Sequence, residues 1–194
     1  MSTLVLKIIY VAFMALSVVI RQPFVRATQN NEIVKDRKTG LEKFLLALVS
    51  LGSFFVPMVY VLTPLLNFAN YSLPVWANGL GVVVFAVGMW LFWRSHSDLG
   101  RNWSVTLEVR EDHTLVTQGV YNAVRHPMYT SIFLWAIGQA LILTNWIAGP
   151  SGLVGFGIMF LFRVKKEEQM MREQFGADYE AYCQRTKRLV PYVL

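Results

Sequence analysis

Five apolar segments alternate with polar segments along this chain of 194 residues. The apolar segments are residues 4–20, 44–66, 76–93, 129–143 and 152–162. A membrane-spanning helix needs ~20 mostly apolar residues, so the first three segments are long enough and the last is short. We therefore predict an all-α integral membrane protein with five transmembrane helices. The last two helices are expected to form a hairpin whose second helix continues into the cytosol.

The basic residues predict the orientation of these helices. Of the 18 Lys and Arg residues, 17 lie in three polar segments, residues 21–43, 94–125 and 163–188. The connections at the opposite ends, residues 67–75 and 144–150, contain no charged side chain. Short loops rich in Lys and Arg remain on the cytoplasmic side of a membrane. We expect the N-terminus outside, the C-terminus in the cytosol, and a multi-pass protein whose active site is on the cytosolic side.

The composition narrows the class of protein and its partners. Hydrophobic residues make up 55% of the chain, which favours a single membrane domain over residues 1–194. We divide it into three N-terminal spans, residues 1–93, and a catalytic part, residues 94–194. The net charge is +6, and the basic residues that produce it flank the apolar segments. Membrane lipid is therefore the expected partner, and nucleic acid is not. The single Cys183 excludes an internal disulfide and a cysteine-ligated metal site, and no metal is expected.

Local patterns predict two further features of the fold. Pro57 lies inside the second apolar segment, where the missing N–H of proline should kink the helix. The polar insertion between the third and fourth segments alternates over residues 103–109 and again over residues 114–118, with turn residues between. Such a pattern predicts a short hairpin, which we expect to form a small cytosolic lobe.

The first cluster of candidate chemistry is Arg125-His126-Pro127-Met128-Tyr129, at the start of the fourth apolar segment. Ionisable residues at a membrane boundary are costly unless a polar or anionic group lies nearby. Pro127 suits the first turn of a helix, which places His126 beside free backbone N–H groups that bind anions. The alternative is an interface anchor with Arg125 on lipid headgroups. The residues alone leave both interpretations open.

The second cluster is Arg163 and Glu167, which share one helix face because they are four residues apart. An ordinary surface salt bridge, worth ~0.3–0.5 kcal/mol, is the simple interpretation. In the alternative, Arg163 holds an anionic substrate and Glu167 a cationic group. Both residues are expected level with Arg125 and His126 at the membrane surface, and this convergence favours a functional site. A third stretch places Tyr179, Tyr182 and Arg185 three residues apart, which is typical of a helical tail that packs on the domain. The alternative is a lid over the pocket.

Together, in this order and spacing, these pieces resemble the isoprenylcysteine carboxyl methyltransferase family, and more widely the phospholipid methyltransferases. The pattern is His113-Thr-Leu-Val116, Gly119-Val-Tyr121, Arg125-His-Pro-x-Tyr129, Arg163-x-x-x-Glu167-Glu168 and Phe175-Gly-x-x-Tyr179. It covers roughly residues 99–191, about half of the chain. In length and number of spans, the chain resembles small prokaryotic integral membrane methyltransferases.

The resemblance implies that S-adenosyl-L-methionine is the methyl donor and S-adenosyl-L-homocysteine the product. It also implies a cytosolic cofactor pocket, with the adenosine near His113, Thr114, Leu115, Val116 and Tyr121. The methionyl end would lie near His126, Pro127, Met128 and Tyr129, and its ammonium near Glu167. Arg163 would face the substrate carboxylate, as the catalytic and substrate-binding residue. Either Thr106 or Glu108 could match a polar family residue that precedes His113, and this choice stays open.

The resulting prediction is methyl transfer to a lipophilic or prenylated acceptor, most simply the carboxylate of a prenylcysteine-like or other membrane-embedded substrate. An amine acceptor is a poorer fit, because Arg163 would repel a cation. The alternatives are an NADPH-dependent membrane reductase of the sterol type and a non-enzymatic lipid-binding protein. The sequence indicates no obligate protein partner.

Overall fold

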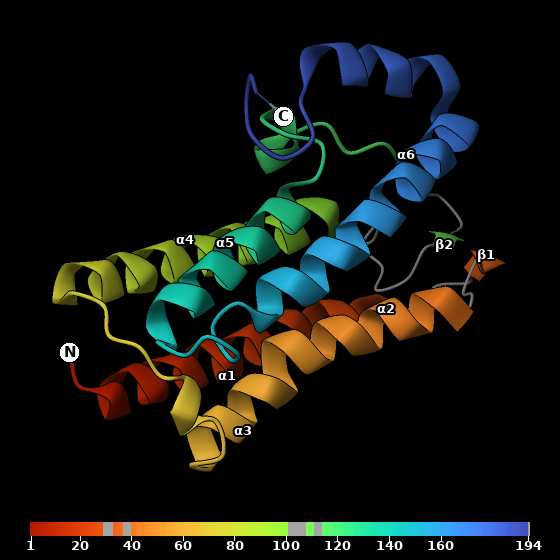
Figure 1. The fold of residues 1–194 in the computed structure, drawn as a ribbon. Coiled ribbons are helices and arrows are strands. Elements are labelled where there is room, and N and C mark those ends of the chain that lie inside the picture. The colour runs from red at the N-terminus through yellow and green to blue at the C-terminus, as the bar shows by residue number, and fades with distance from the viewer. Residues whose placement is uncertain (29–32, 37–39, 101–107, 111–113, 194) are drawn as a thin grey trace.

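The computed structural model describes residues 1–28, 33–36, 40–100, 108–110 and 114–193 (Figure 1). Six α-helices account for most of these residues: α1 (Thr3–Thr28), α2 (Gly40–Ser50), α3 (Val56–Leu62), α4 (Val75–Leu99), α5 (Pro127–Ile142) and α6 (Ser151–Arg185). Two short strands, β1 (Ile33–Asp36) and β2 (Glu108–Arg110), pair antiparallel. The described part of the chain is therefore predominantly helical, which agrees with the predicted all-α membrane class, and it adds one small two-stranded sheet.

Three helical stretches are long and apolar enough to cross a membrane: Thr3–Ala27, Gly40–Leu62 and Val75–Leu99. Helix α5 is apolar but shorter. Helix α6 begins at Ser151 and continues for 35 residues, so the expected continuation beyond its apolar part is confirmed. In Figure 1 its last turns leave the bundle and bend back. An integral membrane fold is thus supported, while the count of five crossings and their orientation stay predictions.

Three boundaries and one pairing differ from the sequence-based prediction. The second predicted segment reaches residue 66, but its helix ends at Leu62. Helix α1 continues beyond residue 20 through Pro23, and α4 continues beyond residue 93 to Leu99. An apolar segment marks where apolar side chains end, whereas backbone hydrogen bonds continue a helix into the polar interface. The predicted local hairpin is not found in the described residues, because β2 pairs with β1 and residues 114–117 are irregular, while residues 103–107 of the predicted first strand lie outside the described residues. Alternation indicates a strand but does not identify its partner.

Pro57 alters the hydrogen bonding of the second apolar segment without ending the helix. A π-helical turn, Leu51–Phe55, joins α2 to α3, and the N–H of Val56 donates to the Leu51 carbonyl. Because Pro57 has no N–H, the carbonyl of Ser53 lacks its usual helical donor. The hydroxyl of Tyr10 on α1 donates to that carbonyl at 2.6 Å. The helix therefore approaches Pro57 through a π turn that also bonds α1, and the kink itself stays a prediction.

The same π turn ties the second apolar segment to α5 and α6. Because the N–H of Val56 bonds to Leu51, the Gly52 carbonyl loses its usual helical donor. It accepts instead from Gln139 Nε2 at 3.1 Å and from Ser151 Oγ at 2.6 Å. Gln139 Nε2 also donates to the Ala148 carbonyl at 2.8 Å. In a membrane, freed backbone groups must be satisfied within the protein, and these side chains do so. The bonds tie the π turn to the last turn of α5 and the first residue of α6, at the ends of these helices that residues 143–150 connect.

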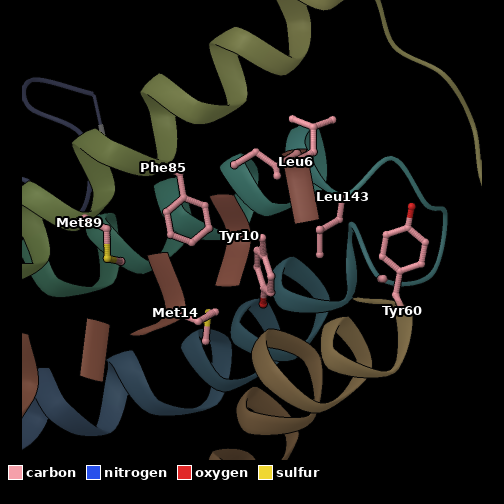
Figure 2. Packing of buried hydrophobic residues seen from close by; sticks show 9 residues of the cluster. Leu6, Tyr10, Met14, Tyr60, Phe85, Met89 and Leu143 are labelled. Atoms are coloured by element: carbon pink, nitrogen blue, oxygen red, sulfur yellow. The ribbon is translucent and has the colours of Figure 1, made fainter. Parts of the chain in front are cut away.

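Buried side chains of α1, α3, α4 and α5 form the main core (Figure 2). Phe85 lies at its centre, stacked on Phe13 with ring centroids 4.4 Å apart and edge-on to Tyr10 at 6.2 Å. A second cluster contains Tyr129 and Phe156, whose ring centroids are 5.8 Å apart. Because Tyr129 also belongs to the first turn of α5, this second cluster supports the polar residues described below.

Two glycines on α6 provide a test of helix packing. A Cβ added at Gly155 would lie 2.7 Å from the Leu48 carbonyl oxygen of α2, whereas one at Gly157 would meet nothing within 4 Å. We expect Gly155→Ala to lower the free energy of unfolding by about 2 kcal/mol through overpacking. Gly157→Ala should be neutral or stabilising by about 0.5 kcal/mol, since alanine favours the helix. Thermal unfolding in detergent measures both variants. Equal melting temperatures would contradict this close packing of α2 on α6.

Candidate active site

The start of α5 is held between α4 and the C-terminal end of the chain. Pro127 occupies the first turn of α5, as predicted, with His126 at the N-cap. The preceding 3-10 turn, Gly119–Asn122, begins at Gly119 with a φ of 60°, a conformation that favours glycine. The N–H of Val120 then donates to Asp98 Oδ2 on α4 at 2.9 Å. This contact places the loop before α5 against the end of α4.

A bend in α6 returns the C-terminus to the same loop. Gly176 has a φ of 50° inside α6, so the helix turns there and the chain runs back beside the residues that precede α5 (Figure 1). The segment 186–189, called the C-terminal segment below, lies parallel to residues 124–126. The N–H of Arg125 donates to the Lys187 carbonyl at 2.7 Å, and that of His126 to the Arg188 carbonyl at 3.0 Å. The predicted packing of the tail on the domain is therefore confirmed.

Four of the residues singled out in the sequence meet between α5 and α6. The hydroxyl of Tyr129 donates to Glu167 Oε2, and the Tyr129 ring stacks on the His126 ring at 5.3 Å and 17°. Glu167 Oε1 lies 3.9 Å from His126 Nδ1, and Glu167 Oε2 lies 3.8 Å from Arg163 Nε. The Glu167 side chain is 28% exposed. The two clusters thus converge, and Glu167 remains accessible to a ligand.

Glu42 on α2 completes this group and was missed by sequence reasoning. Its Oε1 lies 3.6 Å from Arg163 Nη1, and both side chains are largely buried. Arg163 therefore lies between two carboxylates, those of Glu42 and Glu167. The available signal was an acidic residue immediately before an apolar segment, but nothing local indicates that it faces a residue of α6. The contact brings the N-terminal three-span part of the chain into the site.

Glu168, next to Glu167, faces a different set of partners and is only 1% exposed. Its Oε2 lies 2.6 Å from Arg188 Nη2, and its Oε1 lies 3.3 Å from Arg125 Nη2 and 3.4 Å from His126 Nε2. Burial by itself would raise the pKa of Glu168, but the hydrogen bonds and charges of His126 and Arg188 outweigh it. The pKa is consequently held well below its usual value.

The remaining sequence-predicted residues lie around this centre. Pro127 is buried and Met128 is half-buried in the first turn of α5. Tyr121 is buried, and its carbonyl accepts from the Tyr182 hydroxyl at 2.6 Å. Thr114 is exposed, whereas Leu115 and Val116 are half-buried in the irregular segment before the 3-10 turn. Their contacts with adenosine stay predictions. His113 and Thr106 lie outside the described residues, and Glu108 belongs to β2.

The long apolar helices are those of an integral membrane protein. A group of charged side chains lies where α5 and α6 leave the apolar layer, and this group forms the polar site. Residues 79–173 match the family model described as the isoprenylcysteine carboxyl methyltransferase (ICMT) family. This chain is a member of that family and a methyltransferase.

Relatives and a solved structure agree with this assignment. Protein-S-isoprenylcysteine O-methyltransferase B of Arabidopsis thaliana is 29% identical over 157 residues, covering 75% of this chain and 80% of the plant protein. The Tribolium castaneum protein-S-isoprenylcysteine O-methyltransferase is 33% identical over 120 residues, 61% of this chain and 43% of the insect protein. The eukaryotic intramembrane Ras methyltransferase ICMT shares the fold, with a TM-score of 0.61 and 23% identity over 95% of this chain and 67% of its own.

The buried Glu168 predicts a pH dependence of stability. Because its pKa is lowered in the fold, the Glu168 carboxylate stabilises the protein above its ordinary pKa of 4.5, and this contribution is lost as the pH falls below that value. We expect Glu168→Gln to lower the free energy of unfolding by about 3 kcal/mol at neutral pH, since buried cations lose their counter-charge. The variant should also show a shallower decrease in melting temperature on acidification.

The matched control is Glu180→Gln, which removes the partner of Arg172 from an exposed pair at 2.7 Å. An exposed pair is worth at most about 1 kcal/mol, so this variant should melt close to the wild type. Thermal unfolding in detergent between pH 7 and about pH 3 measures both, because the contribution of Glu168 is lost only below its ordinary pKa of 4.5. Equal melting curves for the two variants would contradict the role given to Glu168.

Proposed function

We propose that the chain transfers a methyl group from S-adenosyl-L-methionine to the carboxylate of a prenylcysteine-like or other lipophilic acceptor, at a site facing the cytosol. The observation that carries this proposal is the meeting of His126, Tyr129, Arg163 and Glu167 where α5 and α6 leave the apolar layer. Membership of the family supplies the class of reaction, and the names of the relatives supply the class of acceptor.

The residues of the site fit the cofactor. Its amino-acid end has an ammonium and a carboxylate, so it needs a site with both signs of charge. The partly exposed Glu167 carboxylate offers a partner for the ammonium, and the first backbone N–H groups of α5 offer donors for the carboxylate. Tyr129 and His126 add a hydroxyl and a ring nitrogen beside the same carboxylate. Residues 113–116 and Tyr121 are the candidates for the adenosine.

When bound, the cofactor supplies a methyl group on a positively charged sulfur, and the S–CH3 bond breaks as the O–CH3 bond forms. The acceptor carboxylate is already ionised near neutral pH, so the protein needs no general base. Its contribution is alignment, which is worth several kcal/mol when two reactants are held in line. Arg163 can hold a carboxylate through two parallel hydrogen bonds, and this fixes the direction of the attacking oxygen.

The surroundings of Arg163 favour an anionic acceptor with an apolar tail. Arg163 directly follows Leu161 and Phe162, whose side chains are 69% and 54% exposed on the apolar part of α6. An acceptor whose tail remains in the lipid beside these side chains would present its polar end at the level of Arg163. A carboxylate there is attracted by the guanidinium, whereas an amine is repelled. Exposed Lys165 and Lys166 follow, as expected for a cytosolic boundary.

Ligand binding distinguishes this function from the two alternatives. We expect the detergent-purified protein to bind S-adenosyl-L-homocysteine in a calorimetric titration and not to bind NADPH, since the site contains an acidic partner for an ammonium. Binding of NADPH alone would indicate a reductase of the sterol type. Binding of neither ligand would favour the non-enzymatic lipid-binding protein.

Two substitutions should separate the cofactor from the acceptor. Glu167→Gln is expected to raise the KM for S-adenosyl-L-methionine by roughly tenfold or more, because a charge-assisted hydrogen bond is worth about 1.5–3 kcal/mol. Arg163→Met should mainly reduce kcat/KM for the acceptor, by a similar factor. Lys166→Met is the control, since Lys166 is exposed on the same helix. Methylation of a prenylcysteine analogue measures all three. Identical kinetics of the first two variants and the control would contradict the roles proposed.

A further inference from the structure

The adjacent glutamates of α6 are used differently, and the buried one joins three parts of the chain. Glu168 is 1% exposed, whereas the Glu167 side chain is 28% exposed. The Glu168 carboxylate meets Arg125 and His126 from the loop before α5, and Arg188 from the C-terminal segment. Its role in the proposed reaction is therefore indirect, since its partners fill the space around it.

Arg188 provides the shortest contacts of this group. Its Nη2 lies 2.6 Å from Glu168 Oε2 and its Nε lies 2.9 Å from Glu168 Oε1, the two-bond geometry that suits a guanidinium and a carboxylate. The contacts from Arg125 and His126 to Oε1 are longer, at 3.3–3.4 Å. The orientation of the carboxylate is thus set mainly by a residue 20 positions later in the chain.

That orientation determines how His126 presents its ring. An ionised carboxylate only accepts hydrogen bonds, so Nε2 of His126, 3.4 Å from Glu168 Oε1, must carry a hydrogen. The other nitrogen, Nδ1, then points to the side of Glu167, 3.9 Å from its Oε1. With the hydrogen on Nε2, the lone pair of Nδ1 lies next to the Glu167 carboxylate. Such a pair of acceptors suits a primary ammonium, which has three donors.

We propose that Glu168 and Arg188 are positioning residues, which fix the tautomer and direction of the His126 ring so that the C-terminal segment completes the cofactor site. This inference rests on the proposed function for the identity of the ligand. The geometry of the ring itself does not depend on the ligand. The backbone contacts of Arg125 and His126 with the C-terminal segment hold that segment in place independently of the Arg188 side chain.

The test compares three variants of the full-length protein in detergent. Arg188→Ala removes the guanidinium, and Arg188→Lys keeps the charge without the two-bond geometry. Lys187→Ala is the control, because the Lys187 side chain is exposed in the same segment and the substitution removes the same charge. Its backbone carbonyl, which accepts from Arg125, is retained. Arg188 is 40% exposed, so its replacement is milder than that of the buried Glu168.

Two measurements decide the outcome. Calorimetric titration with S-adenosyl-L-homocysteine should give a dissociation constant raised about tenfold in Arg188→Ala, raised less in Arg188→Lys and unchanged in Lys187→Ala. Nitrogen NMR of histidine-labelled protein, with the His126 signal identified by its loss in His126→Asn, should show a hydrogen on Nε2 in the wild type. In Arg188→Ala this signal should become a mixture of tautomers, while Lys187→Ala retains the wild-type signal.

The results separate failure of this inference from failure of the proposed function. If the wild type binds the ligand but Arg188→Ala binds it equally and retains a single tautomer, the positioning role is wrong. If the wild type does not bind the ligand, the proposed function fails, and the tautomer measurement still tests the effect of Arg188 on His126. Weaker binding in Arg188→Ala and Lys187→Ala alike would also overturn the inference, because it would show a general effect of charge.

Discussion

The charge balance around Glu168 holds the polar end of this molecule together. One buried carboxylate faces two guanidinium groups and an imidazole, and these come from the loop before α5 and from the C-terminal segment. A buried ion pair is costly to form, but removal of one partner leaves a charge without compensation. The bend at Gly176 makes the arrangement possible, because it returns the chain to the loop that it left more than 50 residues earlier. The start of α5, and with it the site, depends on this contact.

The second constraint is imposed by the membrane. Backbone groups within the apolar layer have no water to bond, so the carbonyls released at the π turn must find donors inside the protein. Tyr10, Gln139 and Ser151 supply them from three other helices. Pro57 would weaken an isolated helix, but here the π turn before it forms a junction that is hydrogen-bonded to α1, α5 and α6. The junction positions α5 and α6 relative to each other, and those two helices provide His126, Tyr129, Arg163 and Glu167.

The two neighbouring glutamates illustrate how one helix can serve stability and chemistry together. Adjacent residues of an α-helix are separated by about 100° around its axis, so they point to different surroundings. Glu168 turns towards the C-terminal segment and is saturated by cations, while Glu167 turns towards Arg163 and remains partly exposed. Arg163 in turn lies between Glu167 and Glu42, where a carboxylate ligand would compete with both. The arrangement therefore places carboxylates and a guanidinium side by side.

The sequence by itself determined the features that depend on neighbouring residues. Continuous apolar segments located the helices, Pro127 marked the start of α5, and the spacing of Arg163 and Glu167 placed them on one face. The tertiary structure alone decided which distant residues meet. Glu42 and Arg188 join the site, β2 pairs with β1, and α1 and α4 extend beyond their apolar segments. The physical reason is range: helix periodicity and capping act over a few residues, whereas these contacts depend on how α2, the π turn and the bend at Gly176 pack in space.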